Sequence, residues 1–412
     1  MHVLLIHQYF LEEGDFGGSR FNEMTKVWTD QGHKVTVLAG MVHANGQEKR
    51  KEYKGKFVVE KQQGDVKVFR CHVAESYNKN FIGRFLGYLT FMFWCFYAGV
   101  FKTKEKYDQV LVTSPPLFLG LSGVLIAKIK KIPFVFEIRD LWPESAIDSG
   151  VLTNGLLIKL SFWAEKYIYK KARLINVLTP AFRDKLINTK NVSSSKIIYI
   201  PNACDFSLSE KILANHSKQE LKKQMGWEGK TVFTYVGAHG IANHLVQILD
   251  AMEQITDKNI QFNLIGGGME KQKLKDIAKS RGISNVVFIN PVPKEEVFKY
   301  IIASDFGASV LKKVETFKTI YSNKTFDYMS CKTPVLLLID GISRKLVADA
   351  DCGAYAEPEN TEQIVSTILN LASIEESEKQ KMGTNGYNYA LKYFDRKKLA
   401  TNYSHELSKI KN

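Results

Sequence analysis

Residues 231–240, TVFTYVGAHG, decide the fold because they repeat, halfway along the chain, the pattern with which the chain begins. An apolar run rich in β-branched and aromatic residues predicts a buried strand, and Gly237 predicts a tight turn into a helix. The first residues, HVLLIHQYF at 2–10, have the same character. Two such beginnings predict two separate α/β units.

Both halves of the sequence alternate apolar strands with helical segments. Strands are expected in the first half at 2–10, 33–40, 65–73, 107–116, 131–140, 172–180 and 196–203. In the second half they are expected at 231–240, 260–268, 285–292, 304–311 and 333–340. Continuous apolar strands separated by helices are typical of a parallel sheet covered on both faces. The sequence therefore predicts an α/β protein with two Rossmann-like, doubly wound domains.

The 412 residues exceed what one core usually supports, which agrees with two domains. We expect an N-terminal domain at 1–203, a C-terminal domain at 204–387, and a terminal helical segment at 388–412 that packs back on the N-terminal domain. The polar, helix-prone stretch 203–230 is interpreted as the connection between the domains. Ligands of such sheets bind at the carboxyl ends of the strands, so we expect them in a cleft where the two sheets face each other.

Composition and charge limit the kind of partner. Residues 1–200 carry 29 Lys and Arg against 18 Asp and Glu, whereas the remaining residues carry 28 against 25. The positive N-terminal half favours phospholipid or a lipid pyrophosphate, and the absence of a nucleic-acid-binding motif argues against DNA or RNA. The five cysteines are widely spaced and odd in number. They predict neither a metal site nor disulfides, and with no signal peptide they indicate the cytoplasm.

The segment 85–101, FLGYLTFMFWCFYAGVF, has no charged residue. At about 1.5 Å per residue it barely reaches across a bilayer core of roughly 30 Å. A buried core helix, a helix lying in the headgroup layer and a membrane span are the alternatives. A span would interrupt the series of strands, and the flanking cations favour the second alternative. The cations are Arg84, Lys102, Lys104 and Lys106. We therefore expect peripheral attachment to the anionic inner face of the plasma membrane.

The stretch FVFEIRDLWPES at 134–145 ends a buried strand on an unusual group of side chains. A salt-bridged strand end is one interpretation. In the other, these side chains, Arg139, Asp140, Trp142 and Glu144, belong to a functional site at the strand end.

Three glycine-rich turns follow predicted strands. They contain Gly17 and Gly18, Gly237 with His239, and Gly267 in a run of three glycines. Backbone N–H groups in such turns bind phosphate where a helix begins. No turn has the spacing GxGxxG, which argues against a dinucleotide. Together the turns predict a nucleoside diphosphate ligand.

The segment IYSNKTFDYMS at 320–330 adds two charges to the same edge of the sheet. Ser322 and Asn323 can cap a helix on which Lys324 and Asp327 share one face. The lysine would bind a diphosphate, and the carboxylate would bind ribose hydroxyls. The alternative is an ion pair within the helix.

Taken in order, the segments RDLWPES, IPNACD, YVGAHG, LIGGG and SNKTFDYMSCKTPVLL resemble glycosyltransferase family 4, on a GT-B fold. The pattern is most similar to the bacterial O-antigen and capsule branch with N-acetylfucosaminyltransferase-like enzymes. KTFDYMSCKTPV matches the family's Lys-x-Phe-Glu-Tyr-Met-x-x-Gly-x-Pro-Val. The resemblance implies retaining transfer of a sugar from a nucleotide diphosphate donor in the C-terminal domain to an acceptor on the N-terminal domain, without a metal or cofactor.

The resemblance also assigns residues. Asp327 falls on the carboxylate that binds the donor ribose, with Lys324 beside it for phosphate, and Val292 lies where a backbone group contacts the base. Gly17 and Gly18 would lie under the diphosphate and the transferred sugar.

With this resemblance, the residues of RDLWPES become candidates for catalysis. Asp140 or Glu144 would accept a proton or hold the acceptor. Arg139 would orient a carboxylate or meet an acceptor pyrophosphate, and Trp142 would offer its face to a sugar ring or prenyl chain.

The chain departs from the family pattern in several places. Thr319 stands where the first of two acids is expected, and Asp327 replaces a glutamate. Ala238 and His244 occupy positions at which relatives carry arginine and lysine, and Arg139 replaces a histidine. The lysine of the KTFDYMS motif is therefore expected to neutralise more of the negative charge of the phosphates.

These observations lead to an expected function. The chain is expected to transfer an N-acetylated hexosamine from a UDP donor to a lipid-linked or polysaccharide acceptor. Two alternatives remain at this point. A UDP-N-acetylhexosamine 2-epimerase has the same two-domain fold but needs no acceptor. A non-catalytic scaffold of a polysaccharide assembly complex would explain the missing acid.

Overall fold

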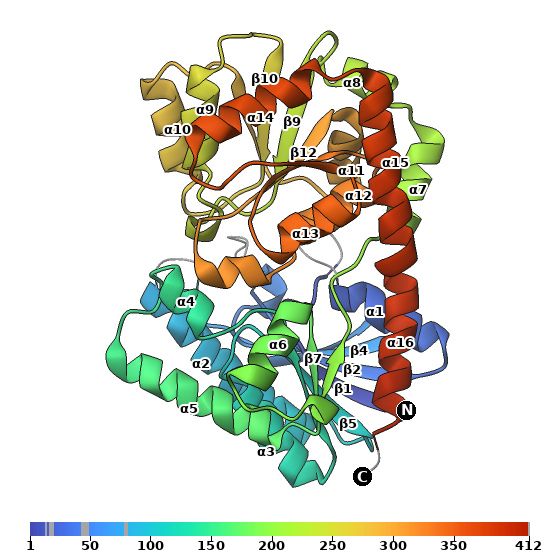
Figure 1. Ribbon diagram of the computed structural model, residues 1–412. Coiled ribbons are helices and arrows are strands. Elements are labelled where there is room, and N and C mark those ends of the chain that lie inside the picture. Colours follow the sequence, from blue (N-terminus) through green and yellow to red (C-terminus); the bar gives the residue numbers. More distant parts are fainter. Residues whose placement is uncertain (13–14, 16–19, 43–48, 78–80, 411–412) are drawn as a thin grey trace. The chain divides into compact units, whose positions relative to one another are not determined.

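The computed structural model describes residues 1–12, 15, 20–42, 49–77 and 81–410. The chain divides into two compact units, each built of a sheet and flanking helices (Figure 1). Unit 1 comprises Met1–Pro201 with Lys397–Asn412, and unit 2 comprises Asn202–Arg396.

Unit 1 is built on an eight-stranded sheet with the order β3-β4-β2-β1-β5-β6-β7-β8. Only the β3–β4 pair is antiparallel among the described strands. The central strand β1 is buried on both faces, which explains its continuous apolar sequence. The strands are β1 (His2–Ile6), β2 (Lys34–Gly40), β3 (Val58–Gln63), β4 (Val66–Cys71), β5 (Gln109–Ser114), β6 (Phe134–Ile138), β7 (Leu174–Val177) and β8 (Ile197–Tyr199).

The helices of unit 1 cover both faces of this sheet (Figure 1). They are α1 (Arg20–Asp30), α2 (Phe81–Tyr97), α3 (Leu119–Lys130), α4 (Glu144–Asp148), α5 (Gly155–Lys171), α6 (Pro180–Asn188) and α16 (Arg396–Ser408). The last helix packs against the first: the Trp28 indole N–H donates to the Ala400 carbonyl at 2.8 Å, and its ring meets Tyr403 edge-on.

Unit 2 has a six-stranded sheet with the order β11-β10-β9-β12-β13-β14, and the described pairs are all parallel. Apolar clusters fill both sides of it. The strands are β9 (Thr231–Val236), β10 (Ile260–Ile265), β11 (Val286–Ile289), β12 (Phe306–Val310), β13 (Val335–Leu338) and β14 (Gly353–Tyr355). The helices are α7 (Phe206–Asn215), α8 (Lys218–Gln224), α9 (Val246–Gln254), α10 (Lys271–Ser280), α11 (Lys294–Ala303), α12 (Asn323–Ser330), α13 (Ile342–Asp349), α14 (Thr361–Ser373) and α15 (Glu376–Tyr393).

The predicted fold class, two Rossmann-like α/β domains, is confirmed, with differences in detail. The stretch 203–230 is not a simple connection, because it forms α7 and α8 and contributes Trp227 to the core of unit 2. The terminal segment 388–412 is divided: residues up to Arg396 belong to unit 2, where Phe394 packs on Phe326, and the remainder belongs to unit 1.

Candidate functional site

In unit 2 the strand order reverses at β9, which lies between β10 and β12. In doubly wound sheets ligands bind beside such a reversal, at the carboxyl ends of the strands. Here the turn after β9 begins with Gly237, and α12 is the first α-helix after β12. The topology therefore places the predicted donor residues Gly237 and Lys324 at the same edge of the sheet.

The glycine turns after β9 and β10 touch through their backbones. The His239 N–H donates to the Gly267 carbonyl at 2.8 Å. Gly266 and Gly268 have φ of 142° and 150°, a region that residues with a Cβ rarely adopt. A Cβ on Gly266 would lie 1.9 Å from the Gly237 carbonyl oxygen. These positions need glycine because another backbone occupies the space of a side chain.

A Gly266→Ala substitution is therefore expected to destabilise unit 2 by about 2 kcal/mol, from backbone strain and displacement of the neighbouring turn. Differential scanning calorimetry of the full chain should show a melting temperature lower by about 4–8 °C. Gly240→Ala is the matched control, because a Cβ there meets only the Asn243 Oδ1 at 3.7 Å. Equal melting temperatures for the two variants would contradict the proposed steric role.

Helix α12 is held against β9 and β12 by two side chains. The Tyr328 hydroxyl accepts from the Val236 N–H at 3.2 Å and donates to the Ala308 carbonyl at 3.0 Å. The Thr325 hydroxyl lies 2.7 Å from that of Ser309. Thus the motif KTFDYMS fixes the helix through its Thr and Tyr and leaves its Lys and Asp half-buried.

Lys324 extends from this helix over Gly237. Its Cε lies 3.2 Å from the position that a Cβ on Gly237 would take, and its ammonium lies 4.7 Å from the centre of the Tyr235 ring. No carboxylate or hydrogen-bond acceptor of the described residues pairs with the ammonium. Burial lowers the pKa of Lys324 to about 8, against the opposing effect of Asp327. A half-buried, unpaired cation at this edge is suited to bind an anion.

Two details of the predicted α12 differ in the structure. Ser322 is the N-cap residue, but its side chain makes no capping hydrogen bond. Lys324 and Asp327 do not form an ion pair within 4 Å, so the alternative of an intrahelical pair is wrong. The cation therefore stays available at the helix N-terminus, where the helix dipole also favours anions.

The other predicted donor residues line the neighbouring turns. The His239 ring is fully buried between Tyr235 and Phe288, and burial lowers its pKa to about 4, so it is neutral at pH 7. His239 thus contributes shape and backbone groups rather than charge. Val292 is half-buried and follows Pro291, whose Cγ would lie 3.2 Å from a Cβ on Gly267.

Sequence reasoning missed Lys271, at the start of α10. Its ammonium donates to the Gly266 carbonyl at 2.7 Å, the Ile289 carbonyl at 2.9 Å and the Asn290 side chain at 3.0 Å. It thereby ties the three-glycine turn to the end of β11. The only signal was a lysine shortly after the glycines, which is common in α/β turns.

In unit 1 the predicted group at the end of β6 separates into two environments. The Asp140 carboxylate accepts from the Ser145 hydroxyl at 2.8 Å, and burial raises the pKa of this carboxyl although that hydrogen bond acts to lower it. The Arg139 N–H donates to the Ser114 carbonyl at 3.1 Å, at the end of β5. Trp142 is half-buried and meets Phe118 edge-on.

Glu144 instead lies in a salt-bridge cluster. Its carboxylate is 2.5 Å from the Lys190 ammonium and 3.8 Å from that of Lys185, and Lys190 also contacts Glu165 at 2.8 Å. The cluster joins α4, α5 and α6. Glu144 therefore fits the interpretation of a salt-bridged strand end, whereas Asp140 has no ion-pair partner within 4 Å among the described residues.

Gly17 and Gly18 lie outside the described residues, and the nearest described side chains on the C-terminal side make a buried network. The guanidinium of Arg20, at the start of α1, donates to both carboxylate oxygens of the buried Glu137, at 3.1 and 3.2 Å. It also donates to the Ile200 and Pro201 carbonyls at 2.9 and 2.5 Å. Asn176 completes the network with a 2.8 Å hydrogen bond to Glu137.

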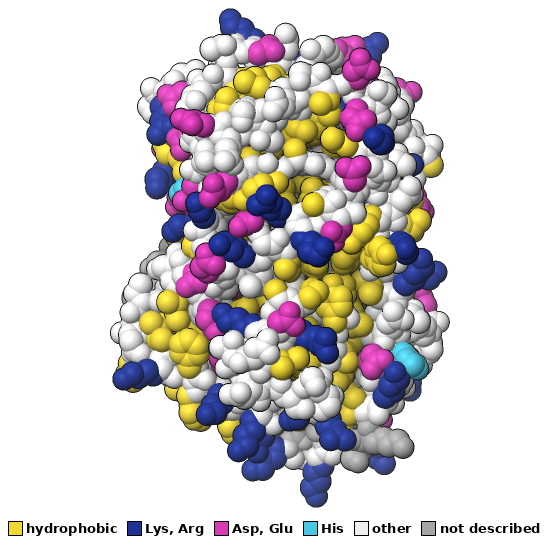
Figure 2. Space-filling view, in the orientation of Figure 1, with side chains coloured by type: hydrophobic (Ala, Val, Ile, Leu, Met, Phe, Trp, Pro, Cys, Tyr) yellow, Lys and Arg dark blue, Asp and Glu magenta, His cyan; other side chains and the backbone are white. Residues whose placement is uncertain are grey.

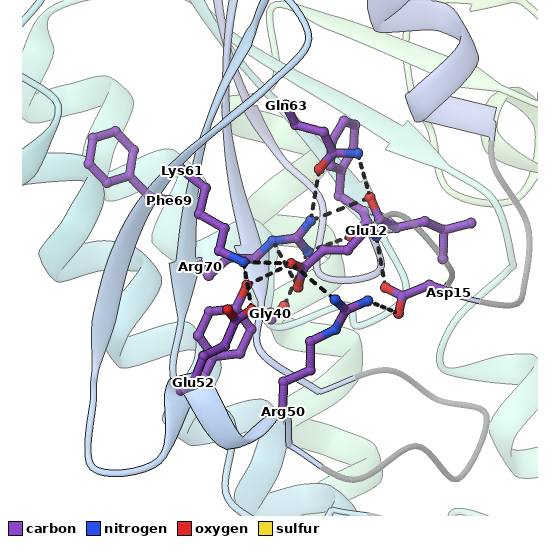
Figure 3. Close-up of polar contacts among 12 residues, drawn as sticks. Glu12, Asp15, Gly40, Arg50, Glu52, Lys61, Gln63, Phe69 and Arg70 are labelled. Atoms are coloured by element: carbon purple, nitrogen blue, oxygen red, sulfur yellow. Dashed lines mark hydrogen bonds and ion pairs between the residues drawn. The ribbon is translucent and has the colours of Figure 1, made fainter.

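The segment that precedes the glycines is anchored by a second charged cluster (Figure 3). Glu12 lies 3.1 Å from Lys61 and 3.5 Å from the fully buried Arg70, and Asp15 lies 2.7 Å from Arg50. These cations come from β3, β4 and the segment before them. Glu12 and Asp15 are thus held by distant residues that no local pattern indicates.

Among the described residues, no group of three or more His, Cys, Asp or Glu side chains is arranged to hold a metal ion. The five cysteines are free and buried.

Two family models match the chain and together extend over most of it. Residues 17–203 match the Glycosyl transferase 4-like domain, and residues 217–389 match Glycosyl transferases group 1. A relative from Escherichia coli K12, named "Putative colanic acid biosynthesis glycosyl transferase WcaI", is 22% identical over 275 residues, which are 66% of this chain and 67% of that protein.

Solved structures share the fold of the whole chain. Sucrose-phosphate synthase of Thermosynechococcus elongatus superposes with a TM-score of 0.75 at 15% identity, covering 99% of this chain and 98% of that one. Anabaena Alr3699/HepE, in complex with UDP and glucose, superposes with a TM-score of 0.73 at 16% identity, covering all of both chains. The neighbours are GT-B glycosyltransferases, which agrees with the predicted fold class.

Proposed function

Because the chain belongs to the glycosyltransferases made of a glycosyl transferase 4-like domain and a group 1 domain, we propose that it transfers a sugar from a UDP donor with retention of configuration. The proposed sugar is an N-acetylated hexosamine, as in the N-acetylfucosaminyltransferase-like branch. The proposed acceptor is lipid-linked or a growing polysaccharide in bacterial surface-glycan synthesis. The proposal includes activity without a metal ion.

The observation that carries the proposal is the Lys324 ammonium above Gly237, which pairs with no acceptor in the described part of the chain. Breaking the bond between the sugar anomeric carbon and the diphosphate places negative charge on the leaving oxygen. A fixed cation, a helix N-terminus and turn N–H groups stabilise that charge without reorganisation. We assign the diphosphate to Lys324, Gly237 and the three-glycine turn, the ribose to Asp327, and the base to the backbone at Val292.

For the acceptor we propose unit 1, with Trp142 against its sugar or lipid part and Asp140 on the attacking hydroxyl. The new bond forms between that hydroxyl oxygen and the anomeric carbon. The hydroxyl proton passes to the departing phosphate oxygen, so the reaction needs no strong protein base. Asp140 would orient the hydroxyl, and Arg139 would bind an acceptor pyrophosphate. Similarity to WcaI of Escherichia coli, which is named for colanic acid biosynthesis, supports a polysaccharide product.

A panel of UDP, GDP, CDP and dTDP with EDTA present tests the donor. UDP at 100 times its Kd is expected to stabilise the protein by about 2.7 kcal/mol, a rise of roughly 5–10 °C in melting temperature. No rise with any nucleotide, or a rise that requires a divalent cation, would overturn the proposed donor site. Conversion of UDP-N-acetylhexosamine to its 2-epimer without an acceptor would identify an epimerase instead.

A further inference from the structure

Three neighbouring helices of unit 1 present an apolar outer side. Helix α3 packs against both α2 and α5 (Figure 1), and the Ser122 hydroxyl donates to the Met92 carbonyl at 3.1 Å. The sheet lies beneath them, since α2 packs on β2 and β4, and α3 and α5 pack on β6. The exposed side chains of the three helices therefore point away from the sheet. We call their outer surface the three-helix face.

Helix α2 buries one side, which includes Phe91 and Cys95, and exposes large apolar residues on the other. A Cβ on Gly87 would lie 2.4 Å from the Tyr77 ring, so this side of the helix is in close contact with the unit. Leu86, Leu89 and Phe93 lie on the outer side, and Phe93 is 60% exposed. Gly83–Lys102 is long and apolar enough to cross a membrane, and only 28% of an 18-residue window within it is buried in the protein. The interpretation of 85–101 as a buried core helix therefore does not fit.

Helices α3 and α5 continue the face. Leu125 and Ile129 on α3 are about half exposed, at helical spacing. On α5, Leu156, Leu160 and Trp163 form a second exposed stripe, with Leu156 77% exposed. Figure 2 shows hydrophobic side chains gathered near α5, with Lys and Arg beside them. Contiguous exposed patches of this kind mark interaction surfaces.

The exposed charges of helices α2, α3 and α5 are all positive. The only acidic residue of these three helices is Glu165, which is buried and paired with Lys190. Glu105, in the segment after α2, is paired with Lys67. None of the lysines on α3, on α5 or just after α2 pairs with a carboxylate of a described residue. They are Lys102, Lys104, Lys106, Lys128, Lys130, Lys159, Lys166, Lys170 and Lys171. An apolar stripe beside unpaired lysines complements the acyl boundary and the headgroups of an anionic bilayer.

We infer that the three-helix face lies in the headgroup layer of an anionic phospholipid membrane. Penetration by α2 alone would remove Phe91 and Cys95 from the core they fill, so attachment along the surface fits better than a span. A second copy of the chain would bring lysines against lysines, which disfavours a dimer through this face. The inference does not depend on the proposed transferase activity.

Sedimentation of the full chain with vesicles tests the inference. We expect binding to vesicles of phosphatidylcholine with 30% phosphatidylglycerol, at least 10-fold weaker binding to phosphatidylcholine alone, and weakening by 0.5 M salt. Phe93→Ser with Trp163→Ser should lower binding at least 10-fold. The matched control is Met269→Ser with Leu369→Ser, two exposed apolar residues of unit 2. Retained binding by the first pair would overturn the inference.

The contribution of the lysines to membrane binding is tested by a second pair of variants. Lys159→Gln, Lys166→Gln and Lys170→Gln together should lower binding about 10-fold or more. Lys273→Gln, Lys275→Gln and Lys279→Gln on α10 remove the same charge from unit 2 and should have little effect. Trp163 emission should shift to shorter wavelength with anionic vesicles. Three results would overturn the inference. One is an equal loss of vesicle binding in both triple variants. Another is resistance of the bound protein to alkaline extraction, which would indicate a span. The third is a dimer that forms without vesicles and that the Phe93 and Trp163 changes abolish.

Discussion

Replacing Lys324 with methionine is expected to lower kcat/KM for the donor by about 100-fold to 1,000-fold, as for other groups that stabilise transition-state charge. Methionine keeps the length of the side chain and removes only the cation. Because the ammonium is half-buried and unpaired among the described residues, its removal leaves no carboxylate without a partner. The melting temperature without nucleotide should therefore stay the same or rise, which separates a binding role from a structural one.

The pH dependence of UDP binding gives the same residue a second signature. The pKa of Lys324 is lowered by burial to about 8 in the free protein, and a bound diphosphate would raise it. At a pH between the Lys324 pKa of the free protein and that of the complex, Lys324 must take up a proton when UDP binds. UDP affinity should therefore fall about 10-fold per pH unit above pH 8 in the native protein and stay flat in Lys324→Met.

Protein stability should change in the opposite direction. The folded pKa lies below the unfolded value of 10.5, so the unfolded chain holds more protons between these values. The contribution of Lys324 to stability therefore rises from about pH 8 to pH 10.5. Lys324→Arg, which keeps its charge, should retain part of the activity and lose the pH dependence of UDP binding. A pH-independent UDP affinity in the native protein would contradict this assignment.

Asp140→Asn is expected to lower kcat by at least about 100-fold while the Kd for UDP changes less than about threefold. Asparagine has the shape of aspartate and its carbonyl can still accept from Ser145, so the turn should fold normally. What is lost is the negative charge that would orient the acceptor hydroxyl. The measurement is transfer to the acceptor together with nucleotide binding by calorimetry.

Glu144→Gln serves as the paired comparison, since it alters a carboxylate only four residues away. Its carboxylate is bound to Lys190, so the substitution should lower the melting temperature by a few degrees and reduce activity only severalfold. The opposite pattern, with full activity in Asp140→Asn and none in Glu144→Gln, would transfer the role to Glu144. Full activity in both would remove this segment from the active site.

Local sequence patterns are sufficient to predict the buried strands and the residues of the proposed donor site. Gly237 was identified because it follows a strand, and Lys324 because it lies in the first turn of a capped helix with the motif KTFDYMS. The strand order then brings them together. β3 was missed because its polar, alternating sequence belongs to an antiparallel edge strand, and β14 because it has only three residues. Such short or half-exposed strands lack the continuous apolar run that identified the others.

The charged clusters could not be predicted for a different reason. Glu12 meets Lys61, and Glu144 meets Lys190, only after distant segments pack. Sequence spacing carries no information on such pairs, so Glu144 and Asp140 looked equivalent. The three-helix face was likewise visible only in part, because the apolar sequence of α2 was evident but its alignment with α3 and α5 depends on the sheet beneath them.

A crystal structure of the full chain with UDP tests the central claim most directly. We predict the diphosphate at the ends of β9 and β12, with an oxygen within about 3.2 Å of the Lys324 ammonium. To make this contact, the ammonium must move away from the Tyr235 ring. UDP bound at another edge of the sheet, or a diphosphate that the lysine does not approach, would contradict it.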